Sequence, residues 1–367
     1  MAIALSLSKF IDVFGEDIII DVLSSIPEKH PNNILGITNP ILRFISETNE
    51  FNGRKLKTKQ NIVVPPEDLS IYKITSSVLG NVKSEIKANP SYQKQLLRNL
   101  LSPRMGSMLT AFNEILAGAY FKSLGHEIKF NSSLDKNKPD VDLINLPFAI
   151  DAKLYPNQIL QMETVINESA QEIIEALKDV HRQDMVIMVK IPEKKAFTNS
   201  LKKLGKAFED KSVNKYNDEG IFAYIAGSNY AGAHVKINLQ TTGTVAHFQP
   251  NWDMAKSIED MKNSCIKATQ QTKSIGKKAI PWVMVPRDGL KMGIQVQMIR
   301  FVAKFHQFVT DYKEEIYIMP VFALDFEGKK VNWIFDIHQI GSNVIGVKQD
   351  SFDSFVNSCI NSPDFYV

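Results

Sequence analysis

The chain has 367 residues, of which 44% are hydrophobic and 23% are charged, as in an ordinary soluble globular protein of one elaborated domain or two. A net charge of +3 is compatible with a nucleic-acid partner but does not indicate one unaided. Two distant cysteines, Cys265 and Cys359, exclude a disulfide framework and a cysteine zinc cluster, which favours a reducing cytoplasm. The first residues lack the basic segment of a secretory signal, and the apolar run at 18–22 is too short to cross a bilayer. We therefore expect a cytoplasmic protein without a membrane partner.

Residues 1–104 are expected to form a mainly helical accessory region. Helical patterns occupy 7–14 and 16–25, and 92–104 reads as an amphipathic helix. The next helix is predicted over 107–124, because its apolar residues recur at helical spacing until Gly125 stops it.

The segment 126–153 predicts a strand followed by a hairpin that carries charged residues. After a short strand at 126–130, a Pro-Asp opens one β-like run, and a tight turn leads to a second run that carries Asp-x-Lys. Residues two apart share a face of a strand, so Asp151 and Lys153 project together. Asp140 stands at the mouth of the preceding run, where we expect it close to Asp151. Two carboxylates beside one ammonium suit a hard cation and metal-assisted phosphodiester hydrolysis.

Alternating helical and β-like patterns continue to the end of the chain. A helix at 165–180 and an apolar strand at 185–191 follow the hairpin directly. The later expected elements are a basic helix at 194–208, strands at 221–226, 234–239 and 244–248, a helix at 253–269, a strand at 280–285, a helix at 293–312, and strands at 316–324 and 331–337.

This element order, with Pro-Asp and Asp-x-Lys on adjacent strands, resembles the PD-(D/E)xK nuclease superfamily. The resemblance covers about residues 105–192, although Asp151 stands where glutamate is usual. It implies an α/β, restriction-endonuclease-like mixed sheet flanked by helices. The nuclease domain would then span 105–367, with its core motif at 105–192 and α+β elaborations at 193–367. A surface hairpin with solvated charges is the alternative to this interpretation.

By this resemblance, Asp140, Asp151 and the backbone carbonyl of Ala152 would ligate Mg²⁺, with Mn²⁺ as a substitute. Lys153 would orient or deprotonate the attacking water and stabilise the charge that develops on the phosphate. Glu114 lies in a helix that is apolar nearly all round, and a buried carboxylate needs a partner or a metal. The resemblance implies that Glu114 completes the metal shell, and a salt bridge to Lys153 is the alternative.

A polar and cationic segment before the strand at 280–285 is a candidate contact for a sugar-phosphate backbone. We name Lys267, Lys273, Lys277 and Lys278 as nucleic-acid-binding candidates, against the alternative of an ordinary solvated loop.

The expected function is a Mg²⁺-dependent endonuclease that hydrolyses DNA in preference to RNA. No phosphate-binding loop, nucleophile elbow or His-Glu-x-x-His motif competes with this chemistry. Analogy with the superfamily suggests a restriction or anti-phage defence enzyme, working as a homodimer or with a partner protein of a defence system. The alternative is a nuclease-fold nucleic-acid-binding or structural module without cleavage activity.

Overall fold

A computed structural model describes residues 3–25, 39, 41–42, 45, 59–62, 66–102, 104–132, 138–154, 158–181, 184–226, 235–239, 242–251, 254–285, 315–317, 320–325, 330–333 and 346–361. These residues form an α/β protein with two larger mixed sheets flanked by helices, and one small strand pair. The expected helix at 293–312 lies outside the described residues.

The larger sheet has six strands and begins as an antiparallel meander. Its strands are β3 (Ile128–Phe130), β4 (Val141–Leu143), β5 (Phe148–Leu154), β11 (Lys278–Val285), β12 (Val321–Asp325) and β13 (Lys330–Trp333), adjacent in that order. β3, β4 and β5 are antiparallel neighbours, whereas β11 runs parallel to both β5 and β12. The sheet therefore changes from antiparallel to parallel at β5, the strand that carries Asp-x-Lys.

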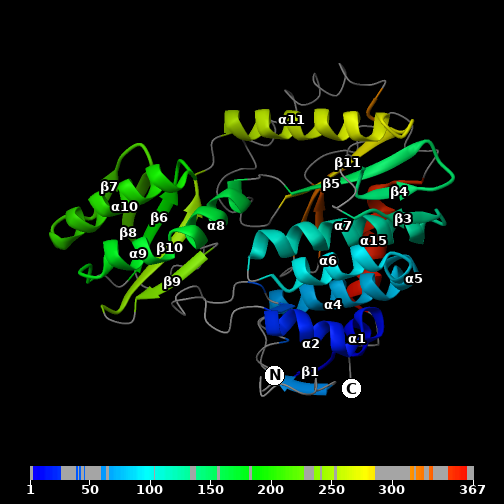
Figure 1. Cartoon of the computed structure of the whole chain (residues 1–367), viewed down its shortest axis with the longest axis horizontal. Coiled ribbons are helices and arrows are strands. Elements are labelled where there is room, and N and C mark those ends of the chain that lie inside the picture. The colour runs from blue at the N-terminus through cyan, green and yellow to red at the C-terminus, as the bar shows by residue number, and fades with distance from the viewer. Residues whose placement is uncertain are drawn as a thin grey trace.

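Helices cover both faces of this sheet (Figure 1). On one face, α7 (Met105–Ser123) packs against β5, with α6 (Pro90–Leu100) and α4 (Pro66–Asn81) packed against α7. On the other face, α11 (Met254–Lys273) packs against β11 and β5. Alternate residues of β5, Phe148, Ile150 and Leu154, join the hydrophobic core shared with α7. Ala149, Asp151 and Lys153, which alternate with them along the strand, therefore face α11.

The amino-terminal region shares this core rather than forming one of its own. Its other elements are β1 (Ile3–Ser6), α1 (Ser8–Phe14), α2 (Glu16–Ser25), β2 (Lys59–Ile62) and α5 (Lys83–Lys87). Phe10 and Leu97 belong to the same buried cluster as Phe112 of α7 and Trp282 of β11. α15 (Gln349–Ile360) closes this cluster from the other end of the chain. The described helices of this region thus pack against the layer that carries Glu114.

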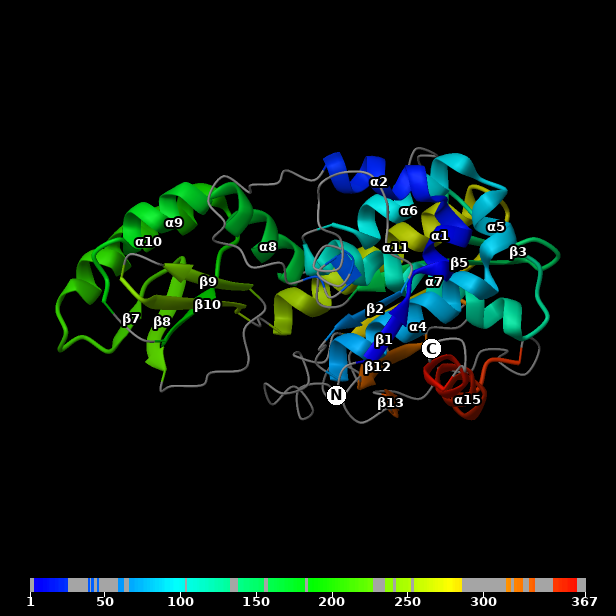
Figure 2. The ribbon, with the colours of Figure 1, turned by 90° about the horizontal axis from the view of Figure 1, so that it is seen from below.

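A second lobe lies between β5 and α11 in the chain. Its elements are α8 (Gln158–Glu168), α9 (Ala170–Leu177), β6 (Asp184–Val189), α10 (Lys194–Glu209), β7 (Lys215–Asn217), β8 (Ile221–Ala226), β9 (Val235–Leu239) and β10 (Thr244–Pro250). The strands form a sheet in the order β7-β8-β6-β10-β9, and the three helices cover one of its faces (Figure 2). This lobe has its own hydrophobic core.

The expected core motif ends too late in the chain, because its last helix and strand belong to the second lobe. The helix expected at 165–180 and the strand expected at 185–191 form α8, α9 and β6, and β6 pairs with β8 and β10 instead of the Asp-x-Lys strand. β6 is strongly apolar because it is the central strand of its own sheet. The parallel neighbour of β5 is β11, reached through α11, since parallel strands need a long crossover. The expected core of 105–192 is therefore wrong beyond the hairpin.

Among the described residues, no helix is both long enough and apolar enough to cross a membrane.

Candidate functional site

The site begins where the pairing between β4 and β5 stops. Pro139 has no amide hydrogen to donate to a ladder, and β4 starts two residues later. Asn131, just after β3, fixes this bend. Its side-chain Nδ2 donates to the Pro139 carbonyl at 2.9 Å, and its backbone N–H donates to the Asp140 carbonyl at 3.0 Å. The Asp140 carboxylate then accepts the amide hydrogen of Ala152 at 2.7 Å. Asp140 thus provides an acceptor for the backbone N–H of Ala152, at the point where the pairing of β4 with β5 has stopped.

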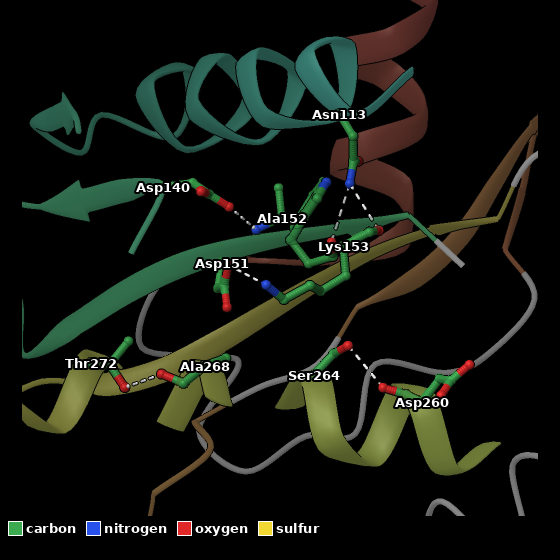
Figure 3. A network of polar contacts seen from close by, with 10 residues as sticks. Asn113, Asp140, Asp151, Ala152, Lys153, Asp260, Ser264, Ala268 and Thr272 are labelled. Atoms are coloured by element: carbon green, nitrogen blue, oxygen red, sulfur yellow. Dashed lines mark hydrogen bonds and ion pairs between the residues drawn. The ribbon is translucent and has the colours of Figure 1, made fainter. Parts of the chain in front are cut away.

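Asp151 and Lys153 project from the same face of β5, as their spacing predicts (Figure 3). The Lys153 Nζ lies 2.7 Å from Asp151 Oδ1. The other oxygen, Asp151 Oδ2, is buried and has no hydrogen-bond partner among the described residues. The Asp151 side chain is 4% exposed and that of Lys153 is 22% exposed, so the ammonium is the more accessible member of the pair.

The backbone of Ala152 presents a carbonyl beside Asp140. The N–H and C=O of one strand residue point toward the same neighbouring strand. The backbone N–H of Ala152 donates to Asp140, which directly precedes β4. The Ala152 carbonyl therefore points to the same side of β5, toward the end of β4. A carbonyl oxygen and carboxylate oxygens are the ligands that Mg²⁺ prefers.

Glu114, on α7, lies close enough to Asp140 and Asp151 to feel the charges of both. Burial, followed by the charges of Asp140 and Asp151, raises the pKa of Glu114 well above its ordinary value, although the neighbouring Tyr92 phenol and Lys153 oppose the shift. Tyr92 is itself buried on α6, where it stacks on Phe130 with ring centroids 4.8 Å apart. The alternative of a salt bridge between Glu114 and Lys153 is not favoured, because Lys153 pairs with Asp151 among the ion pairs of the described residues.

Asp140 and Lys153 have pKa values shifted in ways that reflect this crowding. Burial and the charge of Asp151 raise the pKa of Asp140 to about 8. Burial alone would lower the pKa of Lys153, but Asp151 and Asp140 outweigh it, so its pKa is raised. The ammonium is therefore held charged, while the carboxylates repel one another.

Asn113 is a residue of the site that sequence reasoning missed. Its Nδ2 lies 3.1 Å from the Lys153 carbonyl and 3.3 Å from the Trp282 carbonyl, so α7 is bonded to both parallel strands (Figure 3). The available signal was an amide next to Glu114 in a helix that is otherwise nearly all apolar. Its two acceptors are far apart in the sequence, so the partners themselves had no sequence signal.

The α11 helix forms the opposite wall of the site and was also not foreseen there. Cys265 of α11 is fully buried, and burial raises the pKa of its thiol to about 12, against an opposing effect of Lys153. The side chains of Asp151 and Lys153 lie between β5 and α11 (Figure 3).

The four lysines named as nucleic-acid candidates have different surroundings. Lys277 is ion-paired with Asp142 and also donates to the Leu143 carbonyl, so it clamps β4 to the turn before β11. Lys273 pairs with Glu315 at 2.9 Å. Lys267 and Lys278 are exposed. The structure therefore gives Lys277 an internal role, and leaves Lys267 and Lys278 as the more available cations.

The donor set fits a divalent cation held by few side chains. No group of three or more His, Cys, Asp or Glu side chains among the described residues is arranged to hold a metal ion. Asp140, Asp151 and the Ala152 carbonyl instead provide two carboxylates and one backbone oxygen, and Asp151 Oδ2 is a buried acceptor with no donor within the described chain. Glu114 is a third carboxylate whose charge interacts with both aspartates.

Comparisons with protein-family models, curated proteins and solved structures find no match for this chain. The case for its function therefore rests on the residues described above.

The raised pKa of Asp140 predicts a pH-dependent stability of the metal-free protein. An unfolded aspartate loses its proton near 3.8, whereas folded Asp140 keeps it to about 8, so the folded state loses stability as pH rises between these values. Asp140→Asn keeps an acceptor for the Ala152 amide but cannot ionise. We expect a shallower fall of the melting temperature between pH 5 and pH 8 in this variant, measured by thermal melts in EDTA. Asp179→Asn, an exposed aspartate, is the matched control and should follow the wild type; equal slopes in all three proteins would contradict the prediction.

Proposed function

We propose that this protein is a Mg²⁺-dependent nuclease that hydrolyses phosphodiester bonds of DNA. The observation that carries the proposal is the convergence of Asp140, Asp151, Lys153 and Glu114 at the open end of one hairpin. Buried like charges are costly, and a site that accepts this cost is suited to a cation. Three acidic groups beside one ammonium match the needs of an anionic substrate that is attacked by water.

Asp140, Asp151 and the Ala152 carbonyl would hold Mg²⁺, and Mn²⁺ would substitute for it. When bound, the cation neutralises the scissile phosphate and lowers the pKa of a coordinated water. Burial and the neighbouring carboxylates raise the pKa values of Glu114 and Asp140, and a cation held between the carboxylates would offset their repulsion.

Lys153 would act on the reacting groups directly. Its ammonium is the most accessible charge of the Asp151–Lys153 pair and is held in place by that carboxylate at 2.7 Å. It would orient the attacking water and place a positive charge against the negative charge that develops on the phosphate oxygens. Glu114 would accept a hydrogen bond from a water in the site, and Asn113 would fix the strand backbone from which Lys153 projects.

The layers around the site also support a restriction-endonuclease-like arrangement. α7, the meander β3-β4-β5, α11 and β11 occur in the order helix, three strands, helix, strand, with α7 and α11 on opposite faces of the sheet (Figure 1). The second lobe is an insertion within that order. On this analogy the protein is a restriction or anti-phage defence endonuclease, and a homodimer would allow it to cut both strands of a duplex.

Loss of one proposed metal ligand tests this function. We expect Asp151→Asn to abolish Mg²⁺-dependent cleavage of supercoiled plasmid and linear duplex, because the amide provides no negative charge for the cation. Asp142→Asn is the matched control in the same hairpin, since Asp142 faces Lys277 instead of the site, and it should retain cleavage. Plasmid, linear duplex and RNA are each incubated with Mg²⁺ or EDTA. Wild-type protein that cleaves none of them in Mg²⁺ or Mn²⁺ would favour a binding module without cleavage activity.

Lys153 should be needed for chemistry more than for binding. Lys153→Ala removes the charge, and Lys153→Arg keeps it but directs its donors elsewhere and cannot exchange a proton near neutral pH. Both variants should lose at least about a hundredfold in cleavage rate. Both should still bind duplex DNA in Ca²⁺ in a gel-shift assay on the same preparations. Parallel loss of binding and cleavage would make Lys153 a phosphate anchor, and full activity of Lys153→Arg would exclude proton transfer by this residue.

A further inference from the structure

One segment of the second lobe carries a local excess of positive charge. Residues 194–215, which comprise α10, the turn after it and the first residue of β7, contain seven lysines and two acidic residues. This segment has a net charge of +5 in a chain whose total is +3, so the remaining residues together carry −2. Residues 194–215 are therefore a strongly basic part of the second lobe.

The lysines of α10 lie on one face of the helix. At 3.6 residues per turn, Lys195, Lys202 and Lys206 fall within about 40° of one another around the axis and span about 16 Å along it. Lys203 lies beside them. All four are exposed, and the opposite face is buried through Phe197, Leu201, Leu204 and Phe208. We call the exposed side of α10, with these four lysines, the lysine face.

The buried side of α10 is packed so closely against α9 that this side cannot become a binding surface. A Cβ atom on Gly205 would lie 1.9 Å from the Ala176 carbonyl oxygen of α9, so the two helices are in backbone contact. The apolar residues of α10 belong to the core of the second lobe. The lysine face is therefore a fixed, wholly polar surface with no apolar residues to insert into a lipid layer.

The four lysines have no ion-pair partner among the described residues, unlike several of their neighbours. Lys194 pairs with Glu172 at 3.4 Å, and Lys178 pairs with Glu175 at 2.6 Å. Acidic side chains thus neutralise other lysines of this lobe but not the four lysines of the lysine face. Unpaired like charges in a row repel one another, which a polyanionic partner would relieve.

The second lobe is attached directly to the elements of the candidate site. It begins after β5, which carries Asp151 and Lys153, and it ends at α11. Glu163 of α8 is buried and accepts the amide hydrogen of Gly106 at 2.8 Å, in the first turn of the helix that carries Glu114. Glu163 therefore joins the second lobe to the helix that carries Glu114.

We propose that the lysine face binds the phosphate backbone of duplex DNA without sequence preference; this proposal rests on the nuclease function and names the surface that holds its substrate. Duplex DNA has one negative charge per about 1.7 Å of its axis, so a row of lysines about 16 Å long faces several phosphates. Lysine contributes a compact charge without the bidentate geometry that reads bases. The absence of exposed apolar residues on this face favours DNA over a membrane.

The test compares two variants with the same loss of charge. Lys202→Gln/Lys203→Gln/Lys206→Gln alters the lysine face, and Lys87→Gln/Lys94→Gln/Lys129→Gln alters exposed lysines of the other lobe. Binding of a fluorescent 30-base-pair duplex is measured by anisotropy in EDTA over a range of KCl concentrations, with full-length protein and thermal melts to verify folding. We expect the lysine-face variant to bind roughly ten- to a hundredfold more weakly at 0.1 M KCl, with a log–log salt slope shallower by about 2 to 3. The control variant should change less than threefold.

Equal losses of affinity in the two variants, or none in either, would overturn the proposal. Binding to phosphatidylserine vesicles that depends on Lys202, Lys203 and Lys206, without such dependence for DNA, would also overturn it in favour of a membrane surface. Because binding is measured in EDTA, cleavage does not enter the result. Wild-type protein that binds through the lysine face but never cleaves would contradict the nuclease function alone, and unimpaired DNA binding by the lysine-face variant of an active nuclease would contradict this inference alone.

Discussion

Repulsion between carboxylates at the end of one hairpin is the constraint on which the candidate site depends. Asp140 and Asp151 are brought together because β4 stops pairing at a proline and Asp140 takes over the amide hydrogen of Ala152. The core of α7 and β5 then places Glu114 beside them. One ammonium, on Lys153, offsets part of this charge. Burial and the neighbouring carboxylates raise the pKa values of Glu114 and Asp140, and a divalent cation would offset the repulsion between these groups.

The rest of the molecule holds these groups in place. α7 is bonded to β5 and β11 through Asn113, it is buried against helices of the amino-terminal region, and its first turn is capped by Glu163 from the second lobe. α11 closes the opposite face of the sheet over Asp151 and Lys153. Because the second lobe interrupts the crossover between β5 and β11, both of its chain ends lead into walls of the site. A surface that binds substrate on that lobe is thereby coupled to the site by the chain itself.

Sequence reasoning reached the features that depend on local periodicity and missed those that depend on distant pairing. The shared face of Asp151 and Lys153 follows from the two-residue repeat of a strand, and the helix that carries Glu114 follows from its apolar spacing. The strand at 184–189 is as apolar as a central strand of the main sheet would be, so its composition did not reveal that it belongs to another sheet. Lys277 looked like a phosphate contact in sequence, but its partner Asp142 lies 135 residues away. The roles of Asn113 and α11 likewise depend on contacts that only the folded chain brings together.

Direct measurement of a bound cation tests the proposed site most simply. Mn²⁺ binding can be followed by the loss of the free-ion signal in electron paramagnetic resonance, with Mg²⁺ as competitor. One Mn²⁺ per chain should bind to wild type and to Asp142→Asn, should be displaced by Mg²⁺, and should be lost in Asp140→Asn/Asp151→Asn. Absence of saturable binding to wild type, or undiminished binding to the double variant, would show that the converging carboxylates are not a metal site.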